Sequence, residues 1–228
     1  MINKIKIMAK FPLDLWQLFV TYLPGPIGVK LRYRFWKKRL NFLGKNVIID
    51  VGVYLQNPQF ISLDDNCWID RGVIILAGAD KTQRPRRYIP NKMFPIEKGM
   101  VHIGKKVHIA PYSIISGIGG IYISDECGIA SGTKIFSFSN HYRSDEFPSN
   151  RNFRFALFVD HSSQFMIEGA VFLDNNVGVA SNSVILPGVS IGHDSFILLN
   201  SVVTSCFKEN SLIAGNPAKR IKARFKTE

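Results

Sequence analysis

The chain has 228 residues, 46% of them hydrophobic, and a formal net charge of +12. That apolar content is ample for a continuous core, so the composition excludes disorder of the whole chain. A positive surplus of this size predicts an anionic partner, such as nucleic acid, a phosphate-bearing cofactor or an acidic membrane surface, and composition alone does not choose among them.

Residues 1–42 begin with an apolar stretch that predicts a helix. Between Pro12 and Pro24, apolar residues dominate, and Asp14, Gln17 and Thr21 recur at intervals of three and four to draw a narrow polar stripe. The stretch is too short to span a bilayer, which needs about 20 residues. The polar interruptions and the lack of a small-residue cleavage site also argue against a signal peptide.

A second segment, from Lys30 to Leu40, interleaves basic residues with aromatic ones. An apolar helix followed by a basic aromatic helix is typical of a segment lying in the membrane interface, where rings insert and cations meet anionic lipid. The alternative is a helical cap on the repeats that follow. The two interpretations are compatible, so the sequence predicts peripheral membrane contact through residues 1–42, a cap, or both.

From residue 43 onward, aliphatic residues recur with a step of six, and nearly every one is followed four residues later by a small or β-branched side chain. Gln59 and Gly119 are the exceptions to the second rule. An α-helix would return its apolar face after three or four residues, whereas a step of six suits short strands joined by tight turns. The aliphatic series is Leu43, Ile49, Leu55, Leu63, Ile69, Ile75, Ile103, Ile109, Ile115, Ile123, Ile129, Ile135, Leu173, Val179, Ile185, Ile191, Ile197 and Val203. The small series includes Val47, Val53, Cys67, Val73, Ala79, Val107, Ser113, Cys127, Thr133, Ser139, Val177, Ser183, Val189, Ser195 and Ser201.

Three such strands form one coil of a triangular prism, and successive coils stack about 4.8 Å apart. Antiparallel hairpins would instead show period-two alternation and Asn-Gly or Asp-Gly turns. The turns here are DDNC, GKKV, SDEC, DNNV and GHDS at a fixed phase. The sequence therefore predicts an all-β parallel β-helix over 43–215, preceded by the helical segment 1–42 and followed by a basic tail, 216–228.

Two long interruptions of the repeat, at about 76–102 and about 136–166, follow strands that occupy the third position of a coil. Two steps of eight, after Leu55 and Ile115, fall at the same corner. Both long loops are therefore expected to leave one edge of the prism, two coils or about 10 Å apart. Long loops on a rigid scaffold are where function concentrates.

The repeats LDDNCWIDRGV, ISDECGIASGT and VASNSVILPGVSIG, followed by NSLIAGNPAKRI, resemble the hexapeptide-repeat acetyltransferases over about residues 43–222. The resemblance implies a left-handed β-helix, a homotrimer with active sites between subunits, and acetyl-CoA as the acyl donor. The spacing alone does not give this handedness, because crossovers between parallel strands are normally right-handed. The segment LPGPIGVKLRYRFWKKRLNFLGKNVIID resembles the branch that acetylates polysaccharide or lipopolysaccharide sugars.

In this family the catalytic histidine opens the long loop, and SFSNHYR puts His141 at that place. A sugar hydroxyl is a poor nucleophile, and an imidazole with an ordinary pKa of about 6.5 can accept its proton, which contributes about 10² to 10⁴ in rate. Asp145, Asp160 or a backbone carbonyl would orient the ring. Among the other histidines, His161 is the second choice; His102 and His108 should face outward, and His193 occupies a turn.

The resemblance also suggests where the substrates bind. The basic residues of the loop DKTQRPRRYIPNKMFPIEKG would clamp an anionic acceptor, since the planar guanidinium fork suits phosphate. Solvated surface charge is the alternative. Gly178, where relatives carry tryptophan, is expected to open room for a bulky acceptor. Acetyl-CoA is expected at Ser181, Leu199, Thr204, Ser205, Lys219 and Lys222, and the acceptor at Arg84, Arg86, Arg87, Tyr142 and Arg143.

The function predicted is O-acetylation of a cell-surface polysaccharide or its lipid-linked precursor, by direct transfer and without a metal. N-acetylation of an amino sugar is the nearest alternative, and a zinc enzyme resembling the carbonic anhydrases of this fold is a remoter one. A nucleic-acid binder and a purely structural β-helix are disfavoured, the first because no recognised motif is present. The three widely spaced cysteines, Cys67, Cys127 and Cys206, favour a reducing cytoplasm, and residues 1–42 would attach the protein to the inner membrane face.

Overall fold

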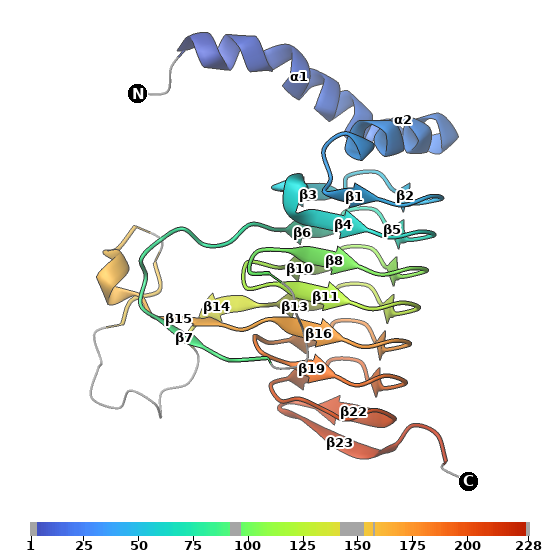
Figure 1. Ribbon diagram of the computed structural model, residues 1–228, viewed down its shortest axis with the longest axis vertical. Coiled ribbons are helices and arrows are strands. Elements are labelled where there is room, and N and C mark those ends of the chain that lie inside the picture. Colours follow the sequence, from blue (N-terminus) through green and yellow to red (C-terminus); the bar gives the residue numbers. More distant parts are fainter. Residues whose placement is uncertain (1–3, 92–96, 142–152, 157, 227–228) are drawn as a thin grey trace.

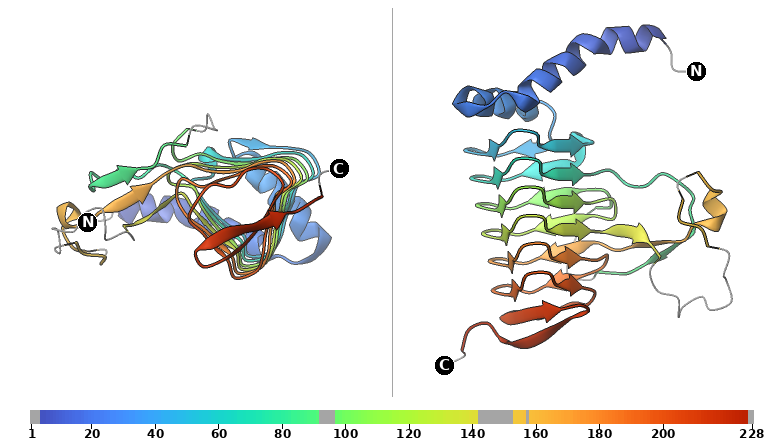
Figure 2. Two further views of the ribbon diagram at one scale, coloured as in Figure 1. Left: turned by 90° about the horizontal axis from the view of Figure 1, so that it is seen from below. Right: turned by 180° about the vertical axis from the view of Figure 1, so that it is seen from behind.

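The computed structural model describes residues 4–91, 97–141, 153–156 and 158–226, with side chains described from residue 13. Within these residues, the body is a triangular prism of stacked coils, each contributing one short strand to each of three sheets (Figures 1 and 2). Strands in neighbouring coils pair in parallel, so the predicted all-β, parallel architecture with an N-terminal helical segment is confirmed.

Three sheets form the faces of the prism, named here sheets A, B and C. Sheet A contains β1 (Phe42–Leu43), β4 (Ile61–Leu63), β8 (Val101–Ile103), β11 (Ile121–Ile123), β16 (Val171–Leu173) and β19 (Ser190–Ile191). Sheet B contains β2 (Ile48–Ile49), β5 (Trp68–Ile69), β9 (His108–Ile109), β12 (Gly128–Ile129), β17 (Gly178–Val179), β20 (Phe196–Ile197), β22 (Ser211–Gly215) and β23 (Ala218–Ala223). Sheet C contains β3 (Tyr54–Gln56), β6 (Ile74–Leu76), β10 (Ile114–Ser116), β13 (Lys134–Phe136), β18 (Val184–Ile185) and β21 (Val202–Val203).

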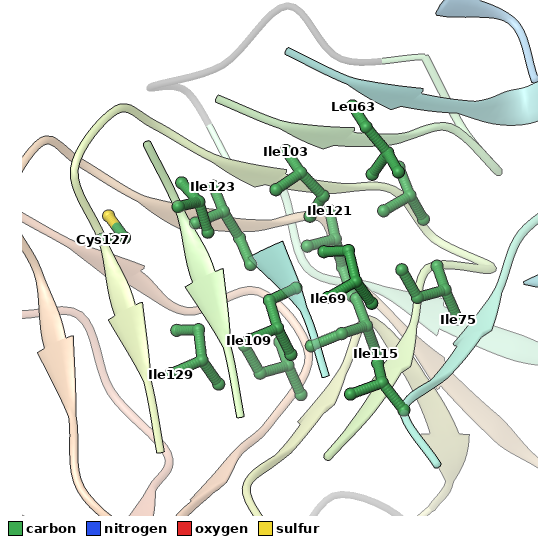
Figure 3. Packing of buried hydrophobic residues seen from close by; sticks show 14 of the residues in the cluster. Leu63, Ile69, Ile75, Ile103, Ile109, Ile115, Ile121, Ile123, Cys127 and Ile129 are labelled. Carbon is green, nitrogen blue, oxygen red and sulfur yellow. The ribbon is translucent and has the colours of Figure 1, made fainter. Parts of the chain in front are cut away.

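The inward series of the six-step repeat forms the core. Every aliphatic residue of that series is buried, and the residues stack in ladders along the prism axis (Figure 3). Most of the small residues four positions later are buried too, but Ala79 and Ser139 are not, so their predicted inward position is wrong. The reason is local: both follow the points where the chain leaves the prism after β6 and β13. Burial raises the pKa of Cys67 and Cys127 to about 12, so these thiols behave as apolar core groups.

Two corners of each coil turn through a residue in the left-handed region. At the corner from sheet A to sheet B, the third residue of each turn sequence identified above has φ between 56° and 63°. These residues are Asn66, Lys106, Glu126, Asn176 and Asp194. Asn and Asp tolerate this conformation better than other side chains, which explains their frequency at the corners. The third corner, from sheet C to sheet A, is the irregular one. It accommodates the 3₁₀ turn η1 (Pro58–Phe60) and both long loops.

The N-terminal segment forms two helices, α1 (Lys4–Tyr22) and α2 (Gly25–Lys37), at one end of the prism (Figure 1). Helix α2 covers the first coil and buries Phe35 and Trp36 against it, as a cap does. The Arg32 side chain is 1% exposed and donates from Nε to Ile49 O at 2.7 Å and from Nη1 to Leu23 O at 2.6 Å. In the described part of the chain, neither helix is long and apolar enough to cross a bilayer.

The opposite end is closed by the C-terminal residues. Strand β22 extends sheet B, and β23 turns back to pair antiparallel with it (Figure 1). Much of the expected basic tail is therefore bonded to the last coil, because β23 begins at Ala218.

Candidate active site

The two long loops meet beside the prism and build a small sheet together, which we call the platform. It contains β7 (Arg86–Tyr88) from the first loop, and β14 (Phe138–Asn140) and β15 (Met166–Glu168) from the second. Strand β15 pairs antiparallel with β14 and parallel with β7. Both loops leave sheet C strands, β6 and β13, which are separated in the sheet by β10, as the spacing predicted. The platform projects from the side of the prism (Figure 2).

His141 lies directly after β14, at the outer end of the platform. Its backbone N–H donates to Phe165 O at 2.9 Å, which continues the β14–β15 pairing by one residue. The imidazole is half-buried and lies edge-on to the Phe165 ring, with 5.1 Å between ring centroids. Phe153 is 6.2 Å from the imidazole and 5.2 Å from Phe165. A backbone hydrogen bond and an aromatic cluster thus hold the histidine in place.

A partly buried ionic cluster holds the platform to its own loops. Glu168, which is 1% exposed, receives Arg86 Nη1 at 2.7 Å on Oε2 and Lys98 Nζ at 2.7 Å on Oε1. Asp80 binds Arg86 at 3.0 Å and Arg84 at 3.2 Å. Burial acts to raise the pKa of Asp80, but hydrogen bonds from Thr82 and the interaction with Arg84 outweigh it, so the pKa is lowered and the carboxylate stays charged.

Gly119 explains why one repeat departs from the expected pattern. A Cβ at this position would lie 2.4 Å from Ser137 O and 3.1 Å from Glu168 Cγ, so any side chain would push the platform away. The Gly119 N–H instead donates to Ser137 Oγ at 2.9 Å. The misfit in the repeat is therefore the point where the prism accommodates the base of the platform.

The proposed acceptor residues fall into two groups. Arg84 and Arg86 are engaged by the carboxylates of the ionic cluster, and Arg84 also donates to Gln164 Oε1 at 3.2 Å. Arg87 is half-buried in the middle of β7. Tyr142, Arg143 and the possible orienting residue Asp145 lie outside the described residues.

The remaining candidates around His141 lie as follows. Asp160 is exposed and precedes the 3₁₀ turn η2 (His161–Ser163), and His161 is also exposed. His102 lies on the outer side of sheet A, with Nε2 3.4 Å from Asp64 Oδ2, and His108 lies on the outer side of sheet B, with Nε2 2.8 Å from Asp70 Oδ2. His193 is exposed in a corner turn, so the predicted orientations of these three histidines are confirmed.

A groove of about 410 Å³ runs along the outer side of sheet B. Its floor is made of small residues in consecutive coils, among them Gly128, Ala130, Gly178 and Ala180, and Ser181 lies in its lining. Of the glycines on this floor, Gly128 has open space above it, which leaves room for a ligand to approach the backbone. The other predicted donor residues follow in the last coils: Leu199, which is exposed, Thr204, Ser205, and Lys219 and Lys222 on β23.

Gly178 does not open space for a bulky acceptor, so that prediction is wrong. A Cβ at this position would meet the Phe196 ring at 2.4 Å, because the ring leans over Gly178 from the next coil. The Arg224 guanidinium also lies over the Phe196 ring, with its Cζ 5.8 Å from the ring centroid.

Three residues of this region were not predicted from the sequence: Phe153 and Phe165, which lie beside His141, and Glu168, at the base of the platform. Glu168 carried a signal, because it is a lone carboxylate in the apolar run FMIEGAVFL, and a charge in such a run is expected to be buried and paired. Phe153 and Phe165 carried none, because aromatic residues are frequent in this chain. In the part of the chain that the structure describes, no three His, Cys, Asp or Glu side chains are placed to hold a metal ion.

Comparison with known proteins places the chain among acyltransferases. No family model matches it. It is 34% identical over 184 residues to a dTDP-4-amino-4,6-dideoxy-D-glucose acyltransferase of Escherichia coli, which covers 81% of this chain and 82% of the relative. It is 30% identical over 128 residues to a putative lipopolysaccharide biosynthesis O-acetyl transferase, WbbJ, of Escherichia coli, covering 55% of this chain and 61% of the relative. It is also 30% identical over 112 residues to a chloramphenicol acetyltransferase of Klebsiella aerogenes, covering 47% of this chain but only 53% of the relative.

Solved structures agree with the architecture. A variant of AntD, an N-acyltransferase from Bacillus cereus in complex with dTDP-4-amino-4,6-dideoxyglucose and coenzyme A, has a TM-score of 0.68 at 25% identity, covering 86% of this chain and 90% of that one. A hexapeptide-repeat-containing acetyltransferase from Vibrio cholerae, complexed with acetyl coenzyme A, has a TM-score of 0.53 at 16% identity and covers 92% and 83%. The second likeness concerns the fold alone.

Proposed function

The chain belongs to the hexapeptide-repeat acyltransferases, and we therefore propose that it transfers an acetyl group from acetyl-CoA to a sugar hydroxyl, with His141 as the general base. The acceptor we propose is a cell-surface polysaccharide or its lipid-linked precursor, as the likeness to WbbJ supports. The observation that carries the proposal is the position of His141, at the outer end of the platform that both long loops build.

The proposed reaction is a direct transfer in which His141 moves one proton. The hydroxyl oxygen attacks the thioester carbonyl carbon while the imidazole accepts the hydroxyl proton. The oxyanion that forms is stabilised by a hydrogen-bond donor, for which a backbone N–H is our candidate. When the intermediate collapses, the C–S bond breaks and the imidazolium returns its proton to the leaving sulfur. The products are the acetyl ester and free coenzyme A.

For the donor, we propose a site along the outer side of sheet B and the last coils, as in the family. The groove with its small-residue floor supports this, and so do the two exposed lysines of β23, Lys219 and Lys222, which suit the phosphates of coenzyme A. Left-handed winding of the prism and a homotrimer with sites between subunits belong to the same proposal. Sedimentation at a mass three times 25.7 kDa would test the trimer.

For the acceptor, we retain Arg84, Arg86 and Arg87, with Tyr142 and Arg143, as the proposed contact with an anionic group. The ion pairs with Asp80 and Glu168 give Arg84 and Arg86 a second role in holding the platform. Asp145 and Asp160 stay our candidates for orienting the imidazole.

A second candidate function is N-acylation of a nucleotide-linked amino sugar. The long match to the dTDP-amino-sugar acyltransferase and the likeness to AntD favour it. The two reactions need His141 to different degrees. A hydroxyl must lose its proton as it attacks, whereas a neutral amine attacks through its free lone pair and loses a proton afterwards. A strong dependence on an imidazole base therefore favours the O-acetyl reaction.

One experiment tests both candidates. Purified protein is supplied with acetyl-CoA and either dTDP-4-amino-4,6-dideoxyglucose or a panel of hydroxyl-bearing glycans, and release of coenzyme A is measured. We expect transfer to a hydroxyl acceptor, a product that hydroxylamine cleaves as an ester, and a fall in kcat of about 10² to 10⁴ in His141→Ala. His161→Ala is the matched control and should keep its activity. Full activity of His141→Ala would overturn the mechanism, and a hydroxylamine-resistant amide would establish the N-acyl reaction.

The proposal places the enzyme in the cytoplasm, with peripheral membrane contact through residues 1–42. The cysteines support a reducing compartment, because Cys67, Cys127 and Cys206 are all free thiols.

A further inference from the structure

Helix α1 turns its apolar side outward. Leu15, Trp16, Leu18, Phe19 and Tyr22 are between 46% and 59% exposed. They cover one broad side of the helix, and Trp16 and Phe19 stack there with 5.7 Å between ring centroids. Ile27, at the start of α2, is 70% exposed and continues the apolar surface. We call these six residues the apolar face.

The polar stripe of α1 faces the protein instead. Asp14, Gln17 and Thr21 line a hollow of about 270 Å³ between α1 and the prism. The edges of Leu18 and Tyr22 reach into the same hollow, and its other walls include Trp36 and Tyr54. A surface helix in water normally does the reverse, burying its apolar stripe and exposing its polar one. The arrangement is therefore suited to a helix whose outer side meets an apolar phase.

Cations lie next to the apolar face. Arg34, Lys37 and Lys38 of the α2 region line one groove together with Trp16, and all three are exposed. Lys30 is exposed on the same helix. The only acidic residue in the sequence from 13 to 41 is Asp14, which lines the hollow on the protein side. The surface thus combines exposed aromatic rings, which can insert among lipids, with positive charge, as interfacial helices do.

We propose that the apolar face and the cations of α2 bind an anionic phospholipid bilayer, with α1 lying in the interface rather than across it. Neither helix is long and apolar enough to cross within the described residues. A second copy of this chain is a poorer partner, because its identical cations would be brought against these. Both helices lie at one end of the prism (Figure 1), so the membrane contacts that end and leaves the platform and sheet B uncovered. This proposal names the residues and the lipid charge behind the membrane contact of the proposed function. It rests on the proposed function for the lipid-linked acceptor.

The test is co-sedimentation of the full chain with vesicles of phosphatidylcholine alone or with phosphatidylglycerol added. We expect binding to the anionic vesicles, at least a fivefold weaker binding to neutral ones, and release by high salt. The variant carrying Trp16→Glu and Phe19→Glu should lose at least nine-tenths of its binding. Phe225→Glu is the control, because Phe225 is 49% exposed and follows β23, at the end of the prism opposite α1 (Figure 1).

A second pair of variants separates local charge from net charge. Arg34→Glu with Lys38→Glu should weaken binding to anionic vesicles at least fivefold, whereas Lys105→Glu with Lys208→Glu changes the net charge equally at exposed sites elsewhere and should leave binding nearly unchanged. Equal losses in both pairs would overturn the assignment to α2. If the Trp16 and Phe19 variant binds vesicles as the parent chain does, the proposal is overturned. It is also overturned if the parent chain binds no vesicles and the variant differs from it only in oligomeric mass.

The outcome is independent of the acetyltransferase assignment. His141→Ala should bind vesicles as the parent chain does, and the Trp16 and Phe19 variant should transfer acetyl groups to a water-soluble acceptor at the parent rate. If His141→Ala proves fully active while vesicle binding follows these expectations, the mechanism fails and the membrane contact stands. If vesicle binding fails while His141 is essential, the reverse holds.

Discussion

His102 is part of an outward stack on sheet A and has no role in the proposed reaction. Its ring lies 4.2 Å from the Tyr122 ring at an interplanar angle of 10°, and Nε2 is 3.4 Å from Asp64 Oδ2. Burial lowers the pKa of His102, and the carboxylates of Asp64 and Asp125 oppose that shift without cancelling it. The stack therefore favours the neutral imidazole.

This shift predicts acid sensitivity in a defined direction. Because the folded-state pKa lies below the unfolded value of 6.5, only the unfolded chain takes up the proton between the two values. Stability should fall as pH falls from about 7 through that window. His102→Gln should reduce this loss, as measured by urea unfolding between pH 7.5 and about 5.

His193 provides the control of opposite sign. Its hydrogen bond to Asp194 raises its pKa, so its contribution is present below 6.5 and is lost as pH rises. The loss of unfolding free energy between pH 7.5 and about 5 should therefore be no smaller in His193→Gln than in the parent chain. An identical acid dependence in His102→Gln and the parent would show that burial of this imidazole does not set the profile.

At the residue scale, the sequence predicted the inward positions well because the six-step period depends only on neighbouring coils. It failed at Ala79 and Ser139, where the chain leaves the prism, and at Gly178, where Phe196 from the next coil fills the space. At Ala79 and Ser139 the period has ended. The period does pair Gly178 with Phe196, but it does not give the direction in which the Phe196 ring leans. The catalytic role of His141 stays a prediction.

At the scale of elements, Glu168 connects the platform to the first loop. Glu168→Gln keeps the size of the side chain and removes its charge, which leaves Arg86 and Lys98 facing a neutral amide. Breaking a fully buried pair costs about 3–5 kcal/mol, and since Lys98 is 44% exposed we expect about 2 kcal/mol here. The loss should loosen the platform, so trypsin should cut the two loops faster. The kcat should fall about tenfold with the KM for acetyl-CoA unchanged, because the proposed donor site lies on another face.

Glu126→Gln is the matched control for that prediction. Glu126 pairs with Lys106 at 2.7 Å but is 55% exposed, and solvent screens such a pair, so its loss should change stability little. Equal protease sensitivity of the two variants would contradict a holding role for Glu168.

The sequence predicted that both loops leave the same corner, but not that they pair with each other. The pairing of β7 with β15 joins residues about 80 positions apart, such as Arg86 and Met166. Neither loop carries the six-step period, so no local signal marks these strands. For residues 1–42 the sequence predicted membrane contact, a cap, or both. It did not choose between them for α1, because a helical wheel shows a stripe and not the side on which the protein lies.

At the scale of the whole molecule, stability is spread along the prism, because each coil contacts only its neighbours. Ile109 is fully buried in sheet B between β5 and β12. Ile109→Ala should lower the free energy of unfolding by about 2–5 kcal/mol, since it leaves a cavity between stacked coils. Urea denaturation measures this. Tyr54→Ala, on the exposed side of β3, should change it by less than about 1 kcal/mol, and a similarly small effect at Ile109 would contradict the ladder as the source of stability.

The parallel architecture was predicted from the repeat, because a step of six with two inward positions suits short strands that stack coil on coil, and the turns do not fit antiparallel hairpins. The handedness and the trimer do not follow from it and depend on family membership. The repeat also does not give the length of the connection from sheet C to sheet A. This corner carries extra residues in several coils without altering the ladders on the three faces.

The antiparallel pair β14 and β15 has a consequence for how such a protein changes over time. Phe138 pairs with Glu168, so the long excursion that carries the histidine begins and ends at adjacent points of the scaffold. The segment between those points can therefore be lengthened, shortened or exchanged in evolution while the coils on either side keep their register. In the proposed enzyme, acceptor preference would diversify by exchange of this segment, and the proposed donor site on sheet B would be inherited unchanged.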